Sequence, residues 1–280
     1  MSWTARLSLY YTLQAQRSVA RFAHEGPLRV LQSLYPEGDA ICHNVLVHPP
    51  SGLVGGDTLD MQARVGSGAH ALVTTPGATR FYRSEAGLAT QQVHAHIAGG
   101  ARLEWLPLEA LAYSGCDALN RARFELEPGA ELMTWDITAL GLPNAHQPFE
   151  QGRFEQHLEI AGPEGTLWLE RGTLAAQDHL LMNGPLGLAG QRCMATLVFA
   201  SGSPMAADRA EAALEAARAA IEASPLRTRA GATQPHPQVL VLRALAPVVE
   251  PAMQLLRPVW AAWRQVLWGL AGNVPRLWNL

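Results

Sequence analysis

A recurring unit of strand, glycine turn and strand constrains the fold of this chain more than any other feature of its sequence. The turns carry Gly68, Gly100, Gly129 and Gly165, at spacings of 32, 29 and 36 residues. Each unit predicts a hairpin, and a single hairpin leaves its apolar face in water, so stacked copies are expected. The first 200 residues therefore predict a mainly β fold, built as a solenoid-like stack of strands and hairpins.

Apolar and polar residues alternate through several segments, among them 5–13, 58–65 and 92–98. Alternation with a period of two over five or more residues is typical of half-buried β-strands. These segments are therefore expected to be strands with one face in the core and the other face in contact with solvent.

His94 and His96 share one face of the third of these segments, where two imidazoles could bind a divalent ion such as nickel or zinc. The apolar face is taken by Val93, Ala95 and Ile97. We therefore expect the two histidines to be solvated surface residues and not nickel ligands.

The chain changes character after residue 200. Segment 205–223 is rich in alanine with helical spacing, 238–246 predicts a strand, and 251–270 predicts a second helix. Pro258 is expected to kink or split that second helix.

The whole chain, 1–280, is expected to form one domain, because no low-complexity linker separates its parts. Its β-rich part covers 1–200, and a helix–strand–helix part covers 201–280. The two C-terminal helices are expected to pack onto the strands.

Composition excludes several classes of function. All 21 basic residues are arginine, and the net charge is -3, so neither Schiff-base chemistry nor a nucleic-acid partner is indicated. Cys42, Cys116 and Cys193 are odd in number and far apart, which fits a reducing compartment. The sequence shows neither a secretory signal nor an apolar run long enough to span a bilayer, so a cytoplasmic protein without a membrane partner is expected.

The glycine-rich segment "HPPSGLVGGDTLD", 48–60, could cradle a phosphate, hold a metal or turn a corner. It has neither the lysine of a P-loop nor the spacing of a dinucleotide-binding fingerprint, so a tight turn is favoured. No nucleophile elbow or HEXXH motif occurs elsewhere.

Five carboxylates near strand ends remain as candidates, each open to an ion-pair or turn-cap role as well as a functional one: Asp57, Asp60, Glu109, Asp136 and Glu170.

A longer set of motifs gives a more specific indication. In order, these are "GPLRVLQSLYPEG", "CHNVLVHPPSGLVGGDTLD", "GAHALVTTPGATRFYRS", "ARLEWLPLEAL", "WDITALGLP" and "VPRLW". Together they resemble the UreD family of urease accessory proteins, called UreH in some organisms, over nearly the whole chain. Two positions depart from the family's usual pattern, which has lysine at Arg80 and arginine at Leu142.

The resemblance implies a non-enzymatic urease accessory protein with a fold of stacked strands and two helices. Such proteins bind apo-urease and UreF, and UreF recruits the GTPase UreG for nickel insertion. The resemblance also implies a bridging role in which transient nickel(II) is conducted through the interior, with no permanently bound cofactor. The alternative is a purely structural adaptor between UreF and urease that makes no contact with the metal.

Family residues that line the nickel route match Asp57, Ser84, Asp136 and Glu170 of this chain. No tight metal site is implied, because oxygen ligands hold nickel weakly. The repeat pattern places Asp136 and Glu170 at nearly equivalent positions of successive units, seven residues after Gly129 and five after Gly165. Asp57, Asp136 and Glu170 are therefore expected to border one connected interior cavity.

Three tryptophans lie close together on the last predicted helix: Trp260, Trp263 and Trp268. Such a helix is either buried against a sheet or part of a partner interface. Because three large aromatics exceed what one buried stripe needs, we expect them in or beside the UreF-binding region.

Overall fold

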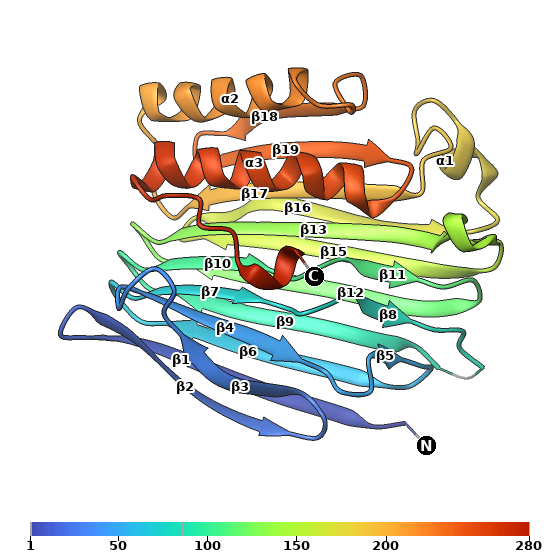
Figure 1. Cartoon of the computed structure of the whole chain (residues 1–280), viewed down its shortest axis with the longest axis horizontal. Helices are drawn as coiled ribbons and strands as arrows, with labels where there is room; N and C mark the ends of the chain where they lie inside the picture. The colour runs from blue at the N-terminus through green and yellow to red at the C-terminus, as the bar shows by residue number, and fades with distance from the viewer. Residues whose placement is uncertain (1, 86, 280) are drawn as a thin grey trace.

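Two β-sheets lie face to face, and a pair of helices covers the outer face of one of them (Figure 1). The computed structural model describes residues 2–85 and 87–279. Sheet A has seven strands, in the order β16 (Gly165–Ala175), β15 (Gly152–Gly162), β12 (Cys116–Leu126), β9 (Ala89–Ile97), β6 (Thr58–Val65), β1 (Thr4–Gln14) and β2 (Arg17–Glu25).

Sheet B has twelve strands. Its main path is β18 (Ala230–His236), β19 (Val239–Ala246), β17 (Cys193–Ser201), β13 (Glu131–Leu142), β10 (Arg102–Leu106), β7 (His70–Thr74), β4 (Ile41–Val47) and β3 (Arg29–Leu34). Four short strands pair beside this path: β5 (Gly52–Leu53), β8 (Thr79–Phe81), β11 (Ala110–Ala112) and β14 (Gln147–Pro148).

The chain winds from one sheet to the other, so that β6, β9 and β12 enter sheet A while β7, β10 and β13 enter sheet B. Neighbouring strands from successive coils are parallel, as in the β6–β9, β9–β12 and β7–β10 pairs. This is the geometry of a solenoid, in which each coil stacks on the one before it. The predicted mainly β, stacked architecture is confirmed.

Three of the four glycine turns are solenoid corners and not hairpins. Gly68, Gly100 and Gly129 adopt φ of 72°, 72° and 76° where the chain passes from sheet A to sheet B, and the Gly100 amide donates to the Gly129 carbonyl at 3.2 Å. Only Gly165 lies in a true hairpin, between the antiparallel strands β15 and β16. The prediction of a hairpin in each unit is therefore wrong at the first three glycines.

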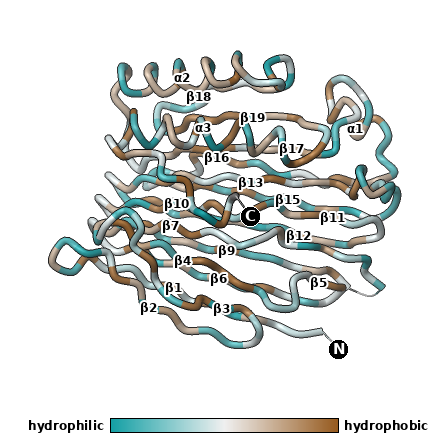
Figure 2. The backbone as a smooth tube through the Cα atoms, viewed as in Figure 1, coloured by the Kyte–Doolittle hydropathy of each residue, from teal (hydrophilic) through white to brown (hydrophobic). Residues whose placement is uncertain are grey.

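Hydrophobic and hydrophilic residues alternate along the strands (Figure 2). The hydrophobic side chains of both sheets fill the space between them. The alternate apolar residues of β6 and β9 are buried, as predicted, and they join one core cluster with residues of sheet B. Strand β13 is buried at almost every position, because sheet A covers one face of sheet B and the C-terminal helices cover the other.

The C-terminal helices form the third layer. Helices α2 (Ala207–Glu222) and α3 (Val249–Trp268) pack against each other and against sheet B, around a second apolar cluster. Helix α3 runs unbroken through Pro258, so the proline does not split it as the sequence had allowed. A short helix, α1 (His179–Asn183), and two 3-10 turns (Pro143–Ala145 and Arg276–Asn279) complete the elements. Within the described residues, no helix is both long and apolar enough to cross a bilayer.

A buried charged network fastens α3 to the solenoid. Arg264, which is fully buried, contacts both carboxylate oxygens of Glu37 at 2.9 and 3.1 Å and Glu104 at 3.4 Å. His43 contacts Glu37, and His70 contacts Glu104, each at 2.9 Å. These partners come from segments far apart in the chain, so the network fixes the position of the helix on sheet B.

Candidate functional site

A row of polar side chains crosses the buried face of sheet A. Gln91 on β9, Asn120 on β12 and Gln156 on β15 are register neighbours on adjacent strands. Gln156 is only 3% exposed. All three occupy strand positions that point toward sheet B, where apolar residues are the norm.

A second polar row crosses the facing side of sheet B. Asp136 on β13 is the register neighbour of Thr196 on β17, which is in turn the neighbour of Arg243 on β19. Thr196 is 1% exposed. Glu170 reaches this row from β16 of sheet A, so the two rows meet between the sheets.

Hydrogen bonds connect one part of this set, from Thr79 to Asp136, and pass from one sheet to the other. Thr79 on β8 donates to Gln91 at 3.2 Å, Gln91 donates to Asn120 at 3.1 Å, and Asn120 donates to Asp136 at 3.3 Å. Thr138 donates to the second carboxylate oxygen of Asp136 at 3.3 Å. We use the name polar file for Thr79, Gln91, Asn120, Asp136, Gln156, Thr196 and Glu170.

A small cavity borders the file. Its volume is about 30 Å³, and its wall combines Thr79, Gln91, Asn120 and Asp136 with apolar residues such as Trp105. A polar space of this size holds a water molecule, which needs roughly 10–15 Å³ of free volume and two to four polar partners. The interior therefore offers a small polar compartment in an otherwise apolar core.

The pKa of Asp136 is strongly perturbed by its surroundings. Burial, together with the nearby charge of Glu170, raises the pKa of Asp136 to about 7, although hydrogen bonds from Thr138 and Gln156 act in the opposite direction. Two carboxylates that repel each other in a low-dielectric space favour a shared proton or a cation between them. At neutral pH Asp136 can thus exchange a proton for another positive charge.

Glu170 is the carboxylate of the file that contacts an exposed cation. It is 9% exposed, and its two carboxylate oxygens accept hydrogen bonds from Thr196 at 3.5 and 3.4 Å. One of these oxygens also forms an ion pair with Arg243. This pair balances the charge of Glu170, whereas Asp136 has no cationic partner within ion-pair distance in the described part of the chain.

The structure brings Asp136 and Glu170 together, but for a reason other than the repeat pattern. Asp136 belongs to β13 of sheet B and Glu170 to β16 of sheet A, so they are not equivalent positions of stacked units. They approach each other across the core from opposite sheets. Their proximity therefore does not follow from the repeat pattern, although both side chains do face the interior.

Asp57 lies apart from this file, in the 48–60 segment that turns the corner between sheet B and sheet A. It is 1% exposed, and its carboxylate accepts hydrogen bonds from the backbone amides of Val54 at 3.0 Å and Trp3 at 3.3 Å. Both oxygens therefore serve as caps for the local backbone. The segment is a corner, as favoured from the sequence.

Ser84 lies in a neighbouring corner, and its hydroxyl donates to the Gly87 carbonyl at 2.6 Å. Neither Ser84 nor Asp57 lines the cavity beside Asp136, and Glu170 does not line it either. Of the three carboxylates predicted to border one connected cavity, only Asp136 lines this one.

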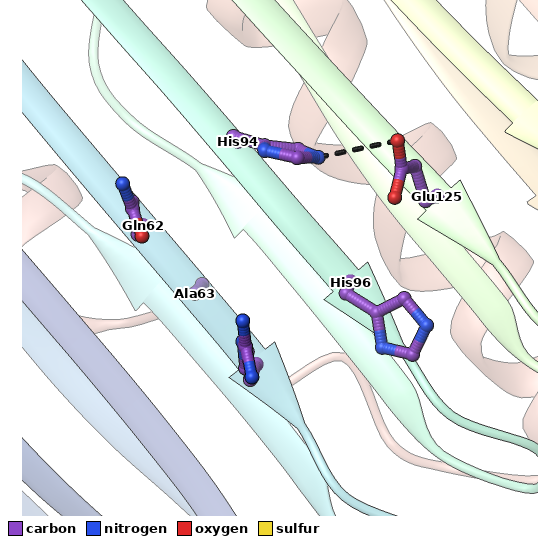
Figure 3. Close-up of a pocket in the computed structure, with 6 residues that line it drawn as sticks. Gln62, Ala63, His94, His96 and Glu125 are labelled. Atoms are coloured by element: carbon purple, nitrogen blue, oxygen red, sulfur yellow. Dashed lines mark ion pairs between the residues drawn. The ribbon is translucent and has the colours of Figure 1, made fainter.

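His94 and His96 lie on the outer face of sheet A, where they line a pocket of about 300 Å³ (Figure 3). Their side chains are 53% and 42% exposed, and they contact Glu125 at 3.3 Å and Glu127 at 3.4 Å, respectively. The expectation that they are solvated is confirmed. Across residues 2–85 and 87–279, no three His, Cys, Asp or Glu side chains are grouped so as to hold a metal ion.

Trp260, Trp263 and Trp268 are buried, with exposed fractions of 0%, 0% and 8%. Their indole N–H groups donate to Glu104, to the Ala213 carbonyl and to Glu131, at 2.7, 2.9 and 2.7 Å. All three pack inside the chain's own second apolar cluster. The prediction of a partner surface on these side chains is contradicted by their burial.

Sequence reasoning missed the amides of the file. Gln91 has the strand parity of the buried residues Val93 and Ala95, and Gln156 has that of Phe154 and Leu158. A polar residue on the apolar face of a predicted strand was therefore the available signal.

Comparison with known proteins places the chain in a family. The family model described as UreD urease accessory protein matches residues 4–279. The urease accessory protein UreD of Paracidovorax citrulli is 63% identical over 280 residues, and that of Variovorax paradoxus is 62% identical over 278, covering 100% and 99% of both chains, respectively. The UreD protein of Leptothrix cholodnii is 52% identical over 281 residues and is likewise covered in full. This chain therefore belongs to the UreD family of urease accessory proteins.

Proposed function

We propose that this protein is a scaffold for GTP-dependent nickel insertion into apo-urease, and that it conducts nickel(II) along its polar file. In this proposal it bridges urease to UreF, and UreF brings the GTPase UreG. Membership of the urease accessory family supports the maturation role. The protein itself catalyses no reaction, acts in the cytoplasm and binds no cofactor permanently.

The observation that carries nickel conduction is the pair Asp136 and Glu170 inside an apolar core. Burying two carboxylates is costly unless water, a proton or a cation accompanies them. The pKa of Asp136, raised to about 7 by burial and by Glu170, expresses that cost. A divalent cation relieves the same repulsion, so the pair favours a transient metal.

The chemistry of the file suits transit better than storage. Its ligands are carboxylate, amide and hydroxyl oxygens, whereas imidazole and thiolate form the stronger nickel sites. Asn120, Gln91 and Gln156 supply amide oxygens beside the carboxylates. A cation held by such groups exchanges readily, as a conduit requires.

We give Asp57 and Ser84 a structural role, because both lie in corners of the solenoid. Asp57 holds the backbone of its corner through two amide hydrogen bonds, and Ser84 closes the next corner. We assign the passage of nickel to Asp136 and Glu170, and the shape of the solenoid end to Asp57 and Ser84.

The experiment separates conduction from the structural-adaptor alternative. Asp136→Asn and Glu170→Gln are introduced singly, with Glu155→Gln on the outer face of β15 as the matched control. Pull-down measures binding to UreF and urease, while urease activity and nickel content measure maturation. Conduction predicts intact complexes with loss of activity and nickel together in the two interior variants. Full activation by both variants would leave the adaptor role as the correct one.

A further inference from the structure

One carboxylate of the polar file pairs with an exposed cation. Glu170 is only 9% exposed, whereas the side chain of its partner Arg243 is 54% exposed. The guanidinium therefore covers the carboxylate from the solvent side.

The surroundings hold Arg243 loosely. Its strand neighbours are Thr196 on β17 and Gly231 on β18, and a side chain at Gly231 would meet nothing within 4 Å. The guanidinium lies 5.8 Å from the ring centroid of Trp168, a cation–π distance. Among the described residues, Arg243 has no ion-pair partner other than Glu170. The side chain can leave the carboxylate by rotating into open solvent.

Glu170 depends on this cation, because no other ion-pair partner of its carboxylate lies among residues 2–85 and 87–279. The second carboxylate nearby, Asp136, adds negative charge, and the hydroxyl of Thr196 donates only a neutral hydrogen bond. A guanidinium and a metal ion cannot both occupy the outward-facing oxygen of Glu170. Whichever cation is bound there excludes the other.

We propose that Arg243 is a gate on the polar file: its guanidinium neutralises Glu170 when no metal is present and must swing away before a divalent cation can pass that carboxylate. This inference rests on the proposed nickel route and specifies how the route is kept closed. Because the Arg243 guanidinium competes with nickel for Glu170, it also lowers the affinity of Asp136 and Glu170 for the metal, so that the metal is not retained.

The test measures nickel(II) binding to the purified full-length chain at neutral pH by isothermal titration calorimetry. Arg243→Met keeps the apolar stem and removes the charge. Arg171→Met is the matched control, because Arg171 is exposed and lies next to Glu170 in sequence but on the opposite face of β16. The gate predicts that Arg243→Met binds nickel about fivefold to tenfold more tightly, while Arg171→Met binds like wild type.

A double variant shows whether the effect passes through Glu170. In Arg243→Met/Glu170→Gln the gain in affinity should disappear. Equal affinity of wild type and Arg243→Met, with binding still lost in Glu170→Gln, would overturn the gate and leave the nickel route intact. No binding to wild type or to Arg243→Met would overturn both.

A fluorescence measurement keeps the proposal testable if Arg243→Met fails to fold. Departure of the guanidinium changes the environment of the Trp168 ring, so nickel should alter the emission of the wild-type chain. That change should be absent in Trp168→Phe. Emission that is unaltered by saturating nickel in the wild-type chain would contradict the gate.

Discussion

Asn120 on β12 donates a hydrogen bond of 3.3 Å to Asp136 on β13, so an amide of sheet A touches a carboxylate of sheet B across the core. Contacts between the facing sheets are otherwise mostly apolar. A partly buried polar contact of this kind helps to fix the relative position of the sheets, because its loss leaves a polar group on each side without its partner.

The first prediction concerns this contact. Asn120→Leu should lower the free energy of unfolding by about 1–3 kcal/mol, because Asp136 loses a hydrogen-bond donor between the two sheets. Urea denaturation at neutral pH measures the change. Gln62→Leu, at an exposed position on the outer face of β6, is the control and should change stability by less than about 0.5 kcal/mol. Equal effects of the two substitutions would contradict a role for the buried contact.

The second prediction concerns the pH dependence that Asp136 imposes. Its pKa is about 7 in the folded chain, against an ordinary value of 3.8, so the folded state keeps a proton that the unfolded state loses. Stability therefore falls as pH rises from about 4 to about 7. Asp136→Asn should remove this fall and make the protein about 1–3 kcal/mol more stable at pH 8.

Denaturation across a pH series provides the measurement for Asp136→Asn, with Asp60→Asn on the solvent-facing side of β6 as its control. An Asp136→Asn profile that runs parallel to wild type between pH 4 and pH 8 would show that this carboxylate is not perturbed by its surroundings.

The third prediction concerns the anchor of α3. Arg264→Met should cost about 3–5 kcal/mol, because it leaves the buried carboxylates of Glu37 and Glu104 without their shared cation. Arg6→Met breaks the exposed pair with Glu25 and should cost less than about 1 kcal/mol. Thermal unfolding compares the two, and similar losses would contradict the anchoring role.

The fourth prediction concerns acid stability. Burial alone would raise the pKa of Glu37, but the hydrogen bonds from His43 and Arg264 outweigh it and lower the pKa to about 2 from an ordinary 4.5. The stabilisation is therefore complete above about pH 4.5 and is lost as pH falls from there toward 2. Glu37→Gln should be less stable than wild type at pH 7, and the two should converge near pH 2. A constant difference across this range would be the contrary result.

The strands and helices could be predicted because their residues carry the pattern locally. The alternation in 58–65 matches β6, and the alanine-rich segment 205–223 matches α2, which begins at Ala207 and ends at Glu222. In both segments the spacing of the apolar residues shows which side of the element faces the core, and this spacing can be seen in residues that are close together in the sequence.

The partners of each strand could not be predicted in the same way. Apolar segments on both sides of Gly100 fit a hairpin and a solenoid corner equally well, because a glycine with positive φ serves in either. The choice depends on strands a full coil away in the sequence. Strand β9 pairs with β6 and β12 and does not pair with β10, which follows it.

The candidate site was predicted only in part for a similar reason. The sequence predicted that Asp136 and Glu170 face the interior, but the residues opposite them depend on how the two sheets face each other. Trp260 was predicted to lie at a partner surface because of its size. Its indole N–H instead donates to the buried carboxylate of Glu104 within the same chain.

Anomalous diffraction at the nickel absorption edge, from crystals of the wild-type chain soaked in nickel(II), tests the central claim most directly. The account predicts an anomalous peak between the two sheets, within coordination distance of the carboxylates of Asp136 and Glu170, and its loss in Asp136→Asn/Glu170→Gln. Peaks confined to the surface, such as beside His94 and His96 on the outer face of sheet A, with none between the sheets, would contradict it.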